Sequence, residues 1–372
     1  MEWHEEMKQC ARTFDDLVKC GAFTEDDRSQ IEPILERAPM AVPPYYLSLI
    51  DFSDPDDPIR KLAIPGFMEA NREGRLDTSG EASNTVLPGL QHKYRESVMM
   101  LSTNACAMYC RHCFRKRLVG LDDKPDMSGC ARNIQEIRAY LEDHPEVTNV
   151  LMSGGDALLN SNERVREILE TLAEVKTLDF IRIATRVPVS LPQRITTDDE
   201  LVSILGDVVK HKQLFMVTQF DHPREITPEA TEAVKKVLAL GIPVRNQTVL
   251  LRGVNADAST LGDLLKGLTR IGVEPYYVFQ CRPVTGVKAQ FQVPLHEGVR
   301  IVEEAKAHQN GLGKAFKYCM SHVRGKIEIL GELSDTKMAF KYHEAKNRDD
   351  LGRLFIKDVT PDQAWFEDDA EL

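Results

Sequence analysis

The sequence of 372 residues lacks any run of about 18 apolar residues, the length needed to cross a bilayer. Its start, MEWHEEMKQC, lacks the basic residues and apolar stretch of a secretory signal. It also lacks an excess of positive charge, because the formal net charge is −11. That balance argues against broad binding to nucleic acid or to anionic membranes. We therefore expect a cytoplasmic protein that acts on small molecules and binds neither nucleic acid nor a membrane.

The chain is also not dense in cysteine, with eight in 372 residues, so a disulfide scaffold is not expected. Three of the eight, Cys106, Cys110 and Cys113, fall within one short segment, which favours a metal site in a reducing compartment. The other five are scattered and are expected to be free, mostly buried thiols: Cys10, Cys20, Cys130, Cys281 and Cys319.

The first 92 residues are expected to form a helical arm. Two stretches, 5–19 and 25–37, have helix-like patterns, and the proline-rich passage ERAPMAVPPYYLSLIDFSDPDDP follows them. Proline cannot sit inside helices or central strands, so this passage is expected to wrap around the rest of the protein.

A repeating strand–helix order begins near residue 97. Short apolar runs rich in β-branched and aromatic residues predict six strands: 97–103, 149–155, 180–185, 214–220, 244–250 and 275–280. Repeated βα order predicts a mostly parallel sheet with right-handed crossovers. Six units favour an α/β fold with a partial (β/α)6 barrel. A doubly wound open sheet is the competing architecture.

Surface helices are expected between the strands. The segment SNERVREILETLAEVK has an apolar face, formed by Val165, Ile168, Leu169 and Leu172, and Ser161 is available as its N-cap. The segments PEATEAVKKVLALG and LHEGVRIVEEAKAH follow the same pattern. After the core at 93–310, the C-terminal segment 311–372 is more charged, with one apolar strand at KIEIL and an acidic end, FEDDAEL.

The cysteine triplet lies in LSTNACAMYCRHCFRKR, directly after the first expected strand. A C-x3-C-x2-C spacing can direct three thiolates to three irons of one 4Fe-4S cluster, which leaves the fourth iron open. A structural zinc site would ordinarily need four protein ligands, and ferredoxin patterns supply a fourth cysteine. Three unrelated loop thiols are the alternative interpretation.

This loop resembles that of the radical S-adenosylmethionine (radical SAM) superfamily, in which the open iron binds the amino and carboxylate groups of S-adenosylmethionine. The motif SGGD, at Ser153, Gly154, Gly155 and Asp156, ends the second expected strand, like the glycine-rich motif that receives the methionyl amino group. Glycines allow close backbone approach, and an acid can pair with an ammonium. The resemblance also assigns His112 and Gln247 to S-adenosylmethionine.

Within that superfamily, the segment from about 39 to 331 resembles the lysine 2,3-aminomutase family. The matching motifs are PMAVPPYYLSLID, HKYRESVMML, TNACAMYCRHCFRKR, VLMSGGDALL, TRVPVSLPQRIT, FDHPREIT, RNQTVLLRGVN and PYYVFQC. The resemblance implies a six-unit partial barrel with its active site at the C-terminal strand ends. It also implies movement of an amino group between α and β carbons, with pyridoxal phosphate carrying the nitrogen.

By family position, the lysine that holds pyridoxal phosphate is Lys326, in SHVRGKIEIL. The family's glycine run before this lysine is reduced here to Gly325. The residues that bind the cofactor phosphate map onto Lys93 and Tyr94. The family motif has one more basic residue, at the position that is Ser97 here. Arg95 is a candidate to compensate.

The substrate residues point away from lysine. Arg115 matches the arginine that clamps the α-carboxylate. The two aspartates that hold the distal ammonium of lysine fall at Arg282 and Cys319, with Met320 and Ser321 nearby. An arginine facing an ammonium would be repulsive, whereas a distal carboxylate would be attracted. The expected reaction is therefore the conversion of L-glutamate to β-glutamate, and lysine 2,3-aminomutase activity is the alternative.

The remaining expectations concern metals, partner molecules and alternative functions. The chain lacks the C-terminal cysteine cluster that binds zinc between subunits of lysine 2,3-aminomutases, so no zinc is expected. We expect a homo-oligomer and an electron donor of flavodoxin or ferredoxin type. The rivals are a radical SAM enzyme that acts on another amino acid or has lost pyridoxal phosphate, and an iron–sulfur protein with no enzymatic role.

Overall fold

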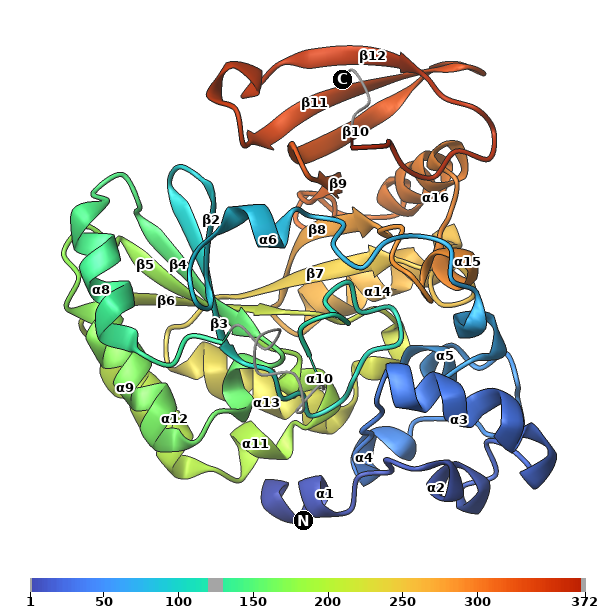
Figure 1. Ribbon diagram of the computed structural model, residues 1–372, viewed down its shortest axis with the longest axis horizontal. Helices are drawn as coiled ribbons and strands as arrows, with labels where there is room; N and C mark the ends of the chain where they lie inside the picture. Colours follow the sequence, from blue (N-terminus) through green and yellow to red (C-terminus); the bar gives the residue numbers. More distant parts are fainter. Residues whose placement is uncertain (1, 120–129, 369–372) are drawn as a thin grey trace.

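The computed structural model describes residues 2–119 and 130–368 (Figure 1). Its strands form one sheet of 12 strands in sequential order. They are β1 (Thr85–Leu87), β2 (Leu90–Tyr94), β3 (Ser97–Thr103), β4 (Asn149–Gly154), β5 (Phe180–Ala184), β6 (Gln213–Thr218), β7 (Val244–Leu250), β8 (Glu274–Gln280), β9 (Lys317–His322), β10 (Gly325–Ser334), β11 (Lys337–Ala345) and β12 (Leu354–Asp358).

The strands from β3 to β9 pair in parallel, each with the next in the chain. A doubly wound sheet reverses its strand order at a switch point, and no reversal occurs among the described strands. The predicted partial barrel is therefore confirmed. Its first six parallel strands coincide with the six predicted ones to within one or two residues at each end.

Long helices cover one face of this sheet (Figure 1): α8 (Ile134–Asp143), α9 (Asn162–Ala173), α12 (Asp199–Val208), α13 (Pro228–Ala239), α14 (Ala258–Arg270) and α16 (Leu295–Ala307). The hydroxyl of Ser161 accepts a hydrogen bond from the backbone N–H of Arg164, which confirms the predicted N-cap of α9. The predicted apolar face of α9 is buried against the sheet. The opposite, concave face of the sheet remains available for a site.

Short helices make up most of the N-terminal segment. They are α1 (Trp3–Lys8), α2 (Phe14–Lys19), η1 (Glu25–Asp27), α3 (Arg28–Arg37), α4 (Pro44–Leu47), α5 (Pro58–Ala63), η2 (Phe67–Ala70) and α6 (Glu81–Asn84). The expected helix over 5–19 is divided in two, because Thr13 caps α2 through a reciprocal bond with Asp16. Between the two helices, Ala11 forms a β-bridge with Val42.

The N-terminal segment is tied to the cysteine loop by buried charges. The guanidinium of Arg111 donates to both carboxylate oxygens of Glu69 at 2.6 and 2.8 Å, and each of these two side chains is only 1% exposed. Lys116 donates to the same carboxylate at 3.0 Å. A buried pair of this kind is costly to break, so the segment around η2 fixes the loop from outside the barrel.

The C-terminal segment extends the sheet instead of forming a separate layer. β9 pairs in parallel with β8, and β10, β11 and β12 then follow in antiparallel order. The predicted strand at KIEIL is part of β10. Buried side chains of these strands, including Ile327, Phe340 and Phe355, pack with α16 in a second hydrophobic core. Part of the acidic end, residues 369–372, lies outside the described residues.

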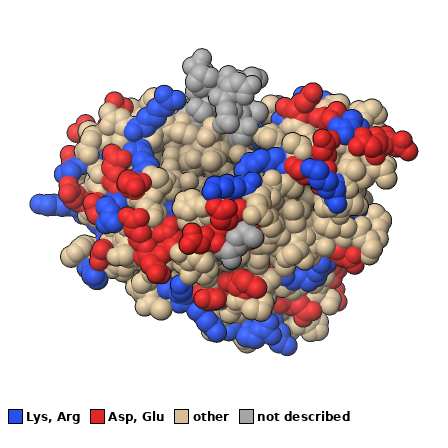
Figure 2. Space-filling model, turned by 90° about the horizontal axis from the view of Figure 1, so that it is seen from below, with Lys and Arg blue, Asp and Glu red and all other residues tan. Residues whose placement is uncertain are grey.

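The remaining short elements lie in connections: α10 (Val187–Ser190), α11 (Gln193–Thr196), α15 (Lys288–Phe291), η3 (Ala157–Leu159), η4 (Pro223–Glu225) and η5 (Arg348–Asp350). The face in Figure 2 carries acidic and basic side chains interspersed. No helix in the described part of the chain is both long and apolar enough to cross a membrane.

Candidate active site

A cavity of about 360 Å³ lies on the concave side of the sheet. Each strand from β2 to β11 contributes at least one residue to its wall, as does the loop with the three cysteines. Side chains alternate between the two faces of a strand, so the positions that do not face the helices point into this space. The cavity therefore gathers residues that lie far apart in the sequence.

Most of the predicted site residues line this one cavity. They are Lys93, Tyr94, Cys106, Cys110, His112, Cys113, Arg115, Ser153, Gly154, Gly155, Asp156, Gln247, Arg282 and Lys326. Three predicted residues do not line it: Arg95, Cys319 and Met320.

The three cysteines have surroundings that suit an iron–sulfur cluster. The thiol sulfur of Cys110 accepts a hydrogen bond from Arg186 Nη1 at 2.9 Å, and that of Cys113 accepts one from the backbone N–H of Arg115 at 3.3 Å. Such N–H···S bonds are typical of cluster ligands. Burial raises the pKa of Cys110 to about 11 and also raises the pKa of Cys106 and of Cys113.

No group of three Cys, His, Asp or Glu side chains among the described residues is close enough to hold a single metal ion. A 4Fe-4S cluster binds one thiolate per iron, so its ligands need not converge on one point. The three thiols on one cavity wall fit the ligand set of such a cluster, with the fourth position open.

The SGGD motif is packed against the cysteine loop. The backbone N–H groups of Gly155 and Asp156 donate to the carbonyls of Thr103 and Ala105 at 2.7 and 2.8 Å. A Cβ at Gly155 would lie 2.2 Å from the carbonyl oxygen of Ala105. The motif needs glycine here because the end of β4 and the loop approach each other so closely.

The Asp156 carboxylate already has partners within the chain. It accepts hydrogen bonds from the Thr185 hydroxyl at 2.6 Å, the Arg186 N–H at 2.7 Å and the Leu158 N–H at 3.1 Å. Burial raises the pKa of Asp156 despite these donors. The residue thus links the ends of β4 and β5, a structural task that the sequence alone did not suggest.

A buried charge network behind Cys110 includes residues that the sequence analysis missed. The Arg186 guanidinium donates to Glu225 at 2.7 Å and lies 3.4 Å from Asp221. Burial raises the pKa of both carboxyls, although Arg186 opposes that rise. The Arg186 guanidinium thus contacts two buried carboxyl groups and the sulfur of Cys110. These residues lie in the motifs TRVPVSLPQRIT and FDHPREIT, but the motifs did not show that the end of β5 and the segment after β6 bring the three side chains together.

His112 is held at the edge of this network. The Gln219 amide donates to His112 Nε2 at 2.7 Å, and burial lowers the pKa of the histidine. Its Nδ1 is buried and has no partner among the described residues. An unpaired buried polar atom on the cavity wall is a candidate contact for a ligand.

Cations gather at the other end of the cavity. Lys93 Nζ donates to the carbonyl of His322 at 2.6 Å. Burial, together with nearby Arg282, Lys326 and Lys346, lowers the pKa of Lys93 to about 7. Several cations so close together suit a dianionic phosphate, which fits the expected pyridoxal phosphate.

Lys326 has one close carboxylate and a set of aromatic neighbours. Its Nζ lies 2.7 Å from Glu344 and 4.3 Å from the ring centroid of Tyr277. Glu344 lies on β11, so no local sequence pattern around Lys326 could have identified it as a partner. The amine is therefore held in a fixed position at the cavity wall.

The expected role of Arg95 in phosphate binding is not supported. Arg95 is exposed in the tight turn between β2 and β3, because Tyr94 and Ser97 already pair across that turn. Arg182 from β5 lines the cavity instead, and its Nη2 donates to the Ser97 hydroxyl at 2.7 Å. The inward alternation of β5 was the signal that could have identified Arg182.

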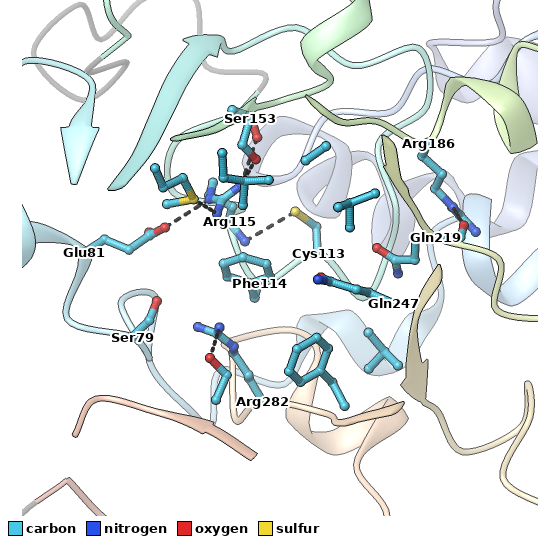
Figure 3. A pocket seen from close by; sticks show the side chains of 18 of the residues that line it. Ser79, Glu81, Cys113, Phe114, Arg115, Ser153, Arg186, Gln219, Gln247 and Arg282 are labelled. Atoms are coloured by element: carbon cyan, nitrogen blue, oxygen red, sulfur yellow. Dashed lines mark hydrogen bonds and ion pairs between the residues drawn. The ribbon is translucent and has the colours of Figure 1, made fainter. Parts of the chain in front are cut away.

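Two arginines flank one aromatic ring inside the cavity. The guanidinium carbons of Arg115 and Arg282 lie 4.5 and 4.1 Å from the ring centroid of Phe114. In Figure 3, Phe114 lies between the two arginines. Both cations are thus kept apart at fixed positions, an arrangement that could bind two separate carboxylates.

Arg115 and Arg282 differ in their partners. Arg115 Nε donates to Glu81 at 3.0 Å, while its Nη2 contacts only the Met99 sulfur, a weak acceptor. Arg282 Nη2 donates to the Ser321 hydroxyl at 2.8 Å. Its Nη1 is buried without a partner, and no carboxylate among the described residues forms an ion pair with it.

The expected contacts of Cys319 and Met320 with substrate are not supported. Met320 is fully buried in the second hydrophobic core, because adjacent residues of β9 face opposite sides of the sheet. Cys319 pairs with Glu328, whereas Ser321 pairs with Lys326 and reaches the cavity. The relevant residue of this strand is therefore Ser321.

The carboxylates that line the cavity are already engaged. Glu81 contacts Arg115 and Arg117, Glu344 contacts Lys326, and Asp156 accepts the bonds described above. The cationic side chains on the wall outnumber them: Lys93, Arg115, Arg182, Arg186, Arg282 and Lys326. The cavity is therefore suited to ligands that carry several negative charges.

Comparison with known proteins yields several similar sequences. A protein of Aquifex aeolicus, provisionally assigned as an L-lysine 2,3-aminomutase, is 39% identical over 359 residues, covering 96% of this chain and 94% of that protein. The L-lysine 2,3-aminomutase of Clostridium subterminale is 38% identical over 83% of this chain and 73% of that protein.

The glutamate 2,3-aminomutase of Clostridioides difficile is 37% identical over 80% of this chain and 69% of that protein. A solved radical SAM methyltransferase from Sphaerobacter thermophilus overlaps with a TM-score of 0.42 at 17% identity, over 62% of this chain and 68% of that one. No protein-family model matches the chain.

Proposed function

The chain belongs to the lysine 2,3-aminomutase family of radical SAM isomerases, and on that premise we propose that it moves the amino group of L-glutamate from C2 to C3. Arg282 is the observation that supports glutamate. It projects into the cavity with a buried, unpartnered Nη1, and burial lowers the pKa of its guanidinium to about 10. A substrate carboxylate would supply the missing counter-charge.

The spacing of the two arginines supports a dicarboxylic substrate. Arg115 offers Nη2 for the α-carboxylate, and Arg282 with the Ser321 hydroxyl offers donors for the distal carboxylate. The Phe114 ring keeps the two cations apart, so both ends of one extended molecule could be bound at once. A contact at each end would also orient the carbon chain between the two arginines.

When bound, the 4Fe-4S cluster and S-adenosylmethionine supply the radical that starts the reaction, and pyridoxal phosphate carries the migrating nitrogen. Cys106, Cys110 and Cys113 would hold the cluster. Lys326 would hold pyridoxal phosphate through its amine, with Glu344 as counter-ion while the amine is charged.

The sequence supplies further residues for the two cofactors. Lys93 and Tyr94 would bind the cofactor phosphate. His112, Gln247 and the backbone of Ser153, Gly154 and Gly155 would contact S-adenosylmethionine.

L-lysine is the competing substrate, because several relatives are named for it. The distal ammonium of lysine would face Arg282, and each carboxylate on the cavity wall already has a partner. Like charges held together in a buried site are strongly disfavoured. This electrostatic mismatch is the specific reason to prefer glutamate.

The test is to incubate the anaerobically reconstituted protein with single amino acids, S-adenosylmethionine, pyridoxal phosphate and a reductant, and to identify β-isomers by NMR. We expect β-glutamate from L-glutamate and no β-lysine from L-lysine. Formation of β-lysine with no reaction of glutamate would overturn the substrate assignment. Reaction of neither, with intact reductive cleavage of S-adenosylmethionine, would point to another amino acid.

A further inference from the structure

Arg182 is a cation in the barrel interior that the proposed reaction has not used. It lies at the middle of β5, where Ile181 and Ile183 face the helices, so its own side chain points inward. Its Nε is buried and has no partner among the described residues. Within the described chain, no carboxylate forms an ion pair with it.

A buried guanidinium without a counter-ion is unfavourable by itself. Burial lowers the pKa of Arg182, and the carboxylate that acts against this shift, Glu344, is committed to Lys326 at 2.7 Å. Desolvation of a charge that lacks a counter-ion is unfavourable. An anionic ligand is the natural partner for such a group.

The neighbours of Arg182 identify the kind of anion. Its Nη2 donates to Ser97 Oγ at 2.7 Å, and Ser97 pairs with Tyr94 across the β2–β3 turn. Lys93 precedes Tyr94, with its Nζ 5.5 Å from the Tyr94 ring centroid. Arg182, Lys93, Ser97 and Tyr94 all line the same cavity, so one arginine, one lysine and two residues with hydroxyl groups could donate to the oxygens of a phosphate monoester.

We propose that Arg182 binds the phosphate group of pyridoxal phosphate. It would supply the positive charge that the family motif has at the position occupied here by Ser97. The inference rests on the proposed use of pyridoxal phosphate at Lys326. The fork of the guanidinium would contact two phosphate oxygens, and the Ser97 hydroxyl would hold the fork in position. Asn149 Oδ1, 3.1 Å from Ser97 Oγ, fixes that hydroxyl in turn.

The experiment compares pyridoxal phosphate with pyridoxal, which lacks only the phosphate. Each is titrated into the anaerobically reconstituted protein, trapped on lysine with borohydride and quantified at the Lys326 peptide by mass spectrometry. The variants are Arg182→Gln and, as a matched control, Arg245→Gln on β7, where the arginine pairs with Glu274 at 2.9 Å. Trapping does not depend on turnover or on the absorbance of the cluster.

We expect Arg182→Gln to weaken binding of pyridoxal phosphate by about 10- to 100-fold, the value of a lost charge-assisted hydrogen bond, and to leave pyridoxal binding unchanged. Arg245→Gln should change neither. An equal loss for both ligands would overturn the proposal, because it would mean that Arg182 only supports the fold. Unchanged binding of pyridoxal phosphate by the Arg182 variant would overturn it as well.

Ser97→Ala provides a second, milder variant in case Arg182→Gln folds poorly. It removes the hydroxyl that holds the guanidinium, so it should weaken pyridoxal phosphate by a few fold and spare pyridoxal. If both ligands weaken equally in this variant, Arg182 is not a phosphate contact. If the wild-type protein shows no label at Lys326 with either ligand, the proposed cofactor lysine itself is wrong, a result distinct from a failure at Arg182.

Discussion

The ammonium of Lys326 and the carboxylate of Glu344 lie 2.7 Å apart and face each other across the antiparallel pair β10–β11. Burial opposes ionisation of Glu344, but the adjacent ammonium outweighs it and holds the pKa of the carboxyl below its usual value. The ion pair therefore fixes the position of the Lys326 amine on the cavity wall.

Replacement of Glu344 by glutamine should destabilise the protein more at pH 7 than at pH 4. The pKa of the folded carboxyl lies below the ordinary value of 4.5, so ionised Glu344 contributes stability that is present above about pH 4.5 and is lost as the pH falls. Urea unfolding of the cluster-free protein at the two pH values would measure the difference in the free energy of unfolding. The control is Glu328→Gln on β10, which breaks the pair with Lys317 at 2.8 Å. A deficit for Glu344→Gln that is equal at both pH values would contradict the expectation.

The variant Arg282→Asp should lose activity toward glutamate. It places a carboxylate where we propose that the distal carboxylate binds, and truncation of a buried charge contact costs about 2–5 kcal/mol, or at least ~30-fold in kcat/KM. Steady-state assays by NMR would measure the change. Arg252→Asp, at an exposed arginine that pairs with Glu297, is the control. A rate equal to wild type would remove Arg282 from the substrate site.

Replacement of Gly155 by alanine should reduce cluster retention. The new Cβ would lie 2.2 Å from the carbonyl of Ala105, so the loop that carries Cys106 would have to move. We expect less iron and sulfide per chain after reconstitution, measured by chemical analysis. Gly262→Ala in α14 is a matched control, because its Cβ would meet only ordinary contacts at 3.5 Å or more. Full iron content in Gly155→Ala would contradict the expectation.

The variant Arg186→Met should destabilise the protein more at neutral than at acidic pH. It leaves Asp221 and Glu225 buried without their cation, a loss of about 3–5 kcal/mol. Burial already raises the pKa of both carboxyls, so the folded state binds protons more readily than the unfolded state. The deficit should therefore shrink as the pH falls toward 5 and grow as it rises.

Urea unfolding of the cluster-free protein at pH 5 and pH 7 would measure this difference in the free energy of unfolding. The surface variant Arg166→Met, which breaks a 3.7 Å pair with Glu170, should change it by less than about 1 kcal/mol. A pH-independent deficit for Arg186→Met would mean that packing, and not charge, explains the loss.

Lys93→Met should stabilise the ligand-free protein. The folded pKa of Lys93 is lowered to about 7, while an unburied lysine has a pKa of 10.5. The cost of its buried charge is complete below pH 7 and disappears as the pH rises from 7 toward 10.5. At about 1.4 kcal/mol per pKa unit, less the lost hydrogen bond to His322, the gain in the free energy of unfolding at pH 6 should be about 3–4 kcal/mol, and it should fall above pH 8 in urea unfolding. A loss of stability at pH 6 would contradict this.

Much of the fold could be predicted because its signals are local. The strands from β3 to β8 appear as short apolar runs, and Ser161 marks the start of α9. The same kind of signal was missed at Thr13, where a capping box with Asp16 divides the expected helix over 5–19. The register of β9 against β10 could not be predicted from the sequence. The residue of this strand that lines the cavity is Ser321, not Cys319 or Met320.

The candidate site also contains some residues that could be predicted from local patterns and others that could not. The cysteine spacing and the glycines after β4 are local patterns, and both lie at the cavity. Arg182, Glu344 and Gln219 come from separate strands or connections, and only the folded sheet brings them next to the predicted residues. Arg95 was expected at the site because it is close to Lys93 in sequence, but a tight turn directs it to solvent.

Because the sheet continues from β8 into β9 and β10, the residues of one cavity come from segments that are synthesised at different times. A ribosome releases the chain from its N-terminus, so the three cysteines, Arg115 and Arg282 all emerge before Lys326. A product that stopped before β10 would contain the three cysteines proposed to hold the cluster but would lack Lys326, the residue proposed to hold pyridoxal phosphate. Premature termination would thus separate the two proposed cofactor sites.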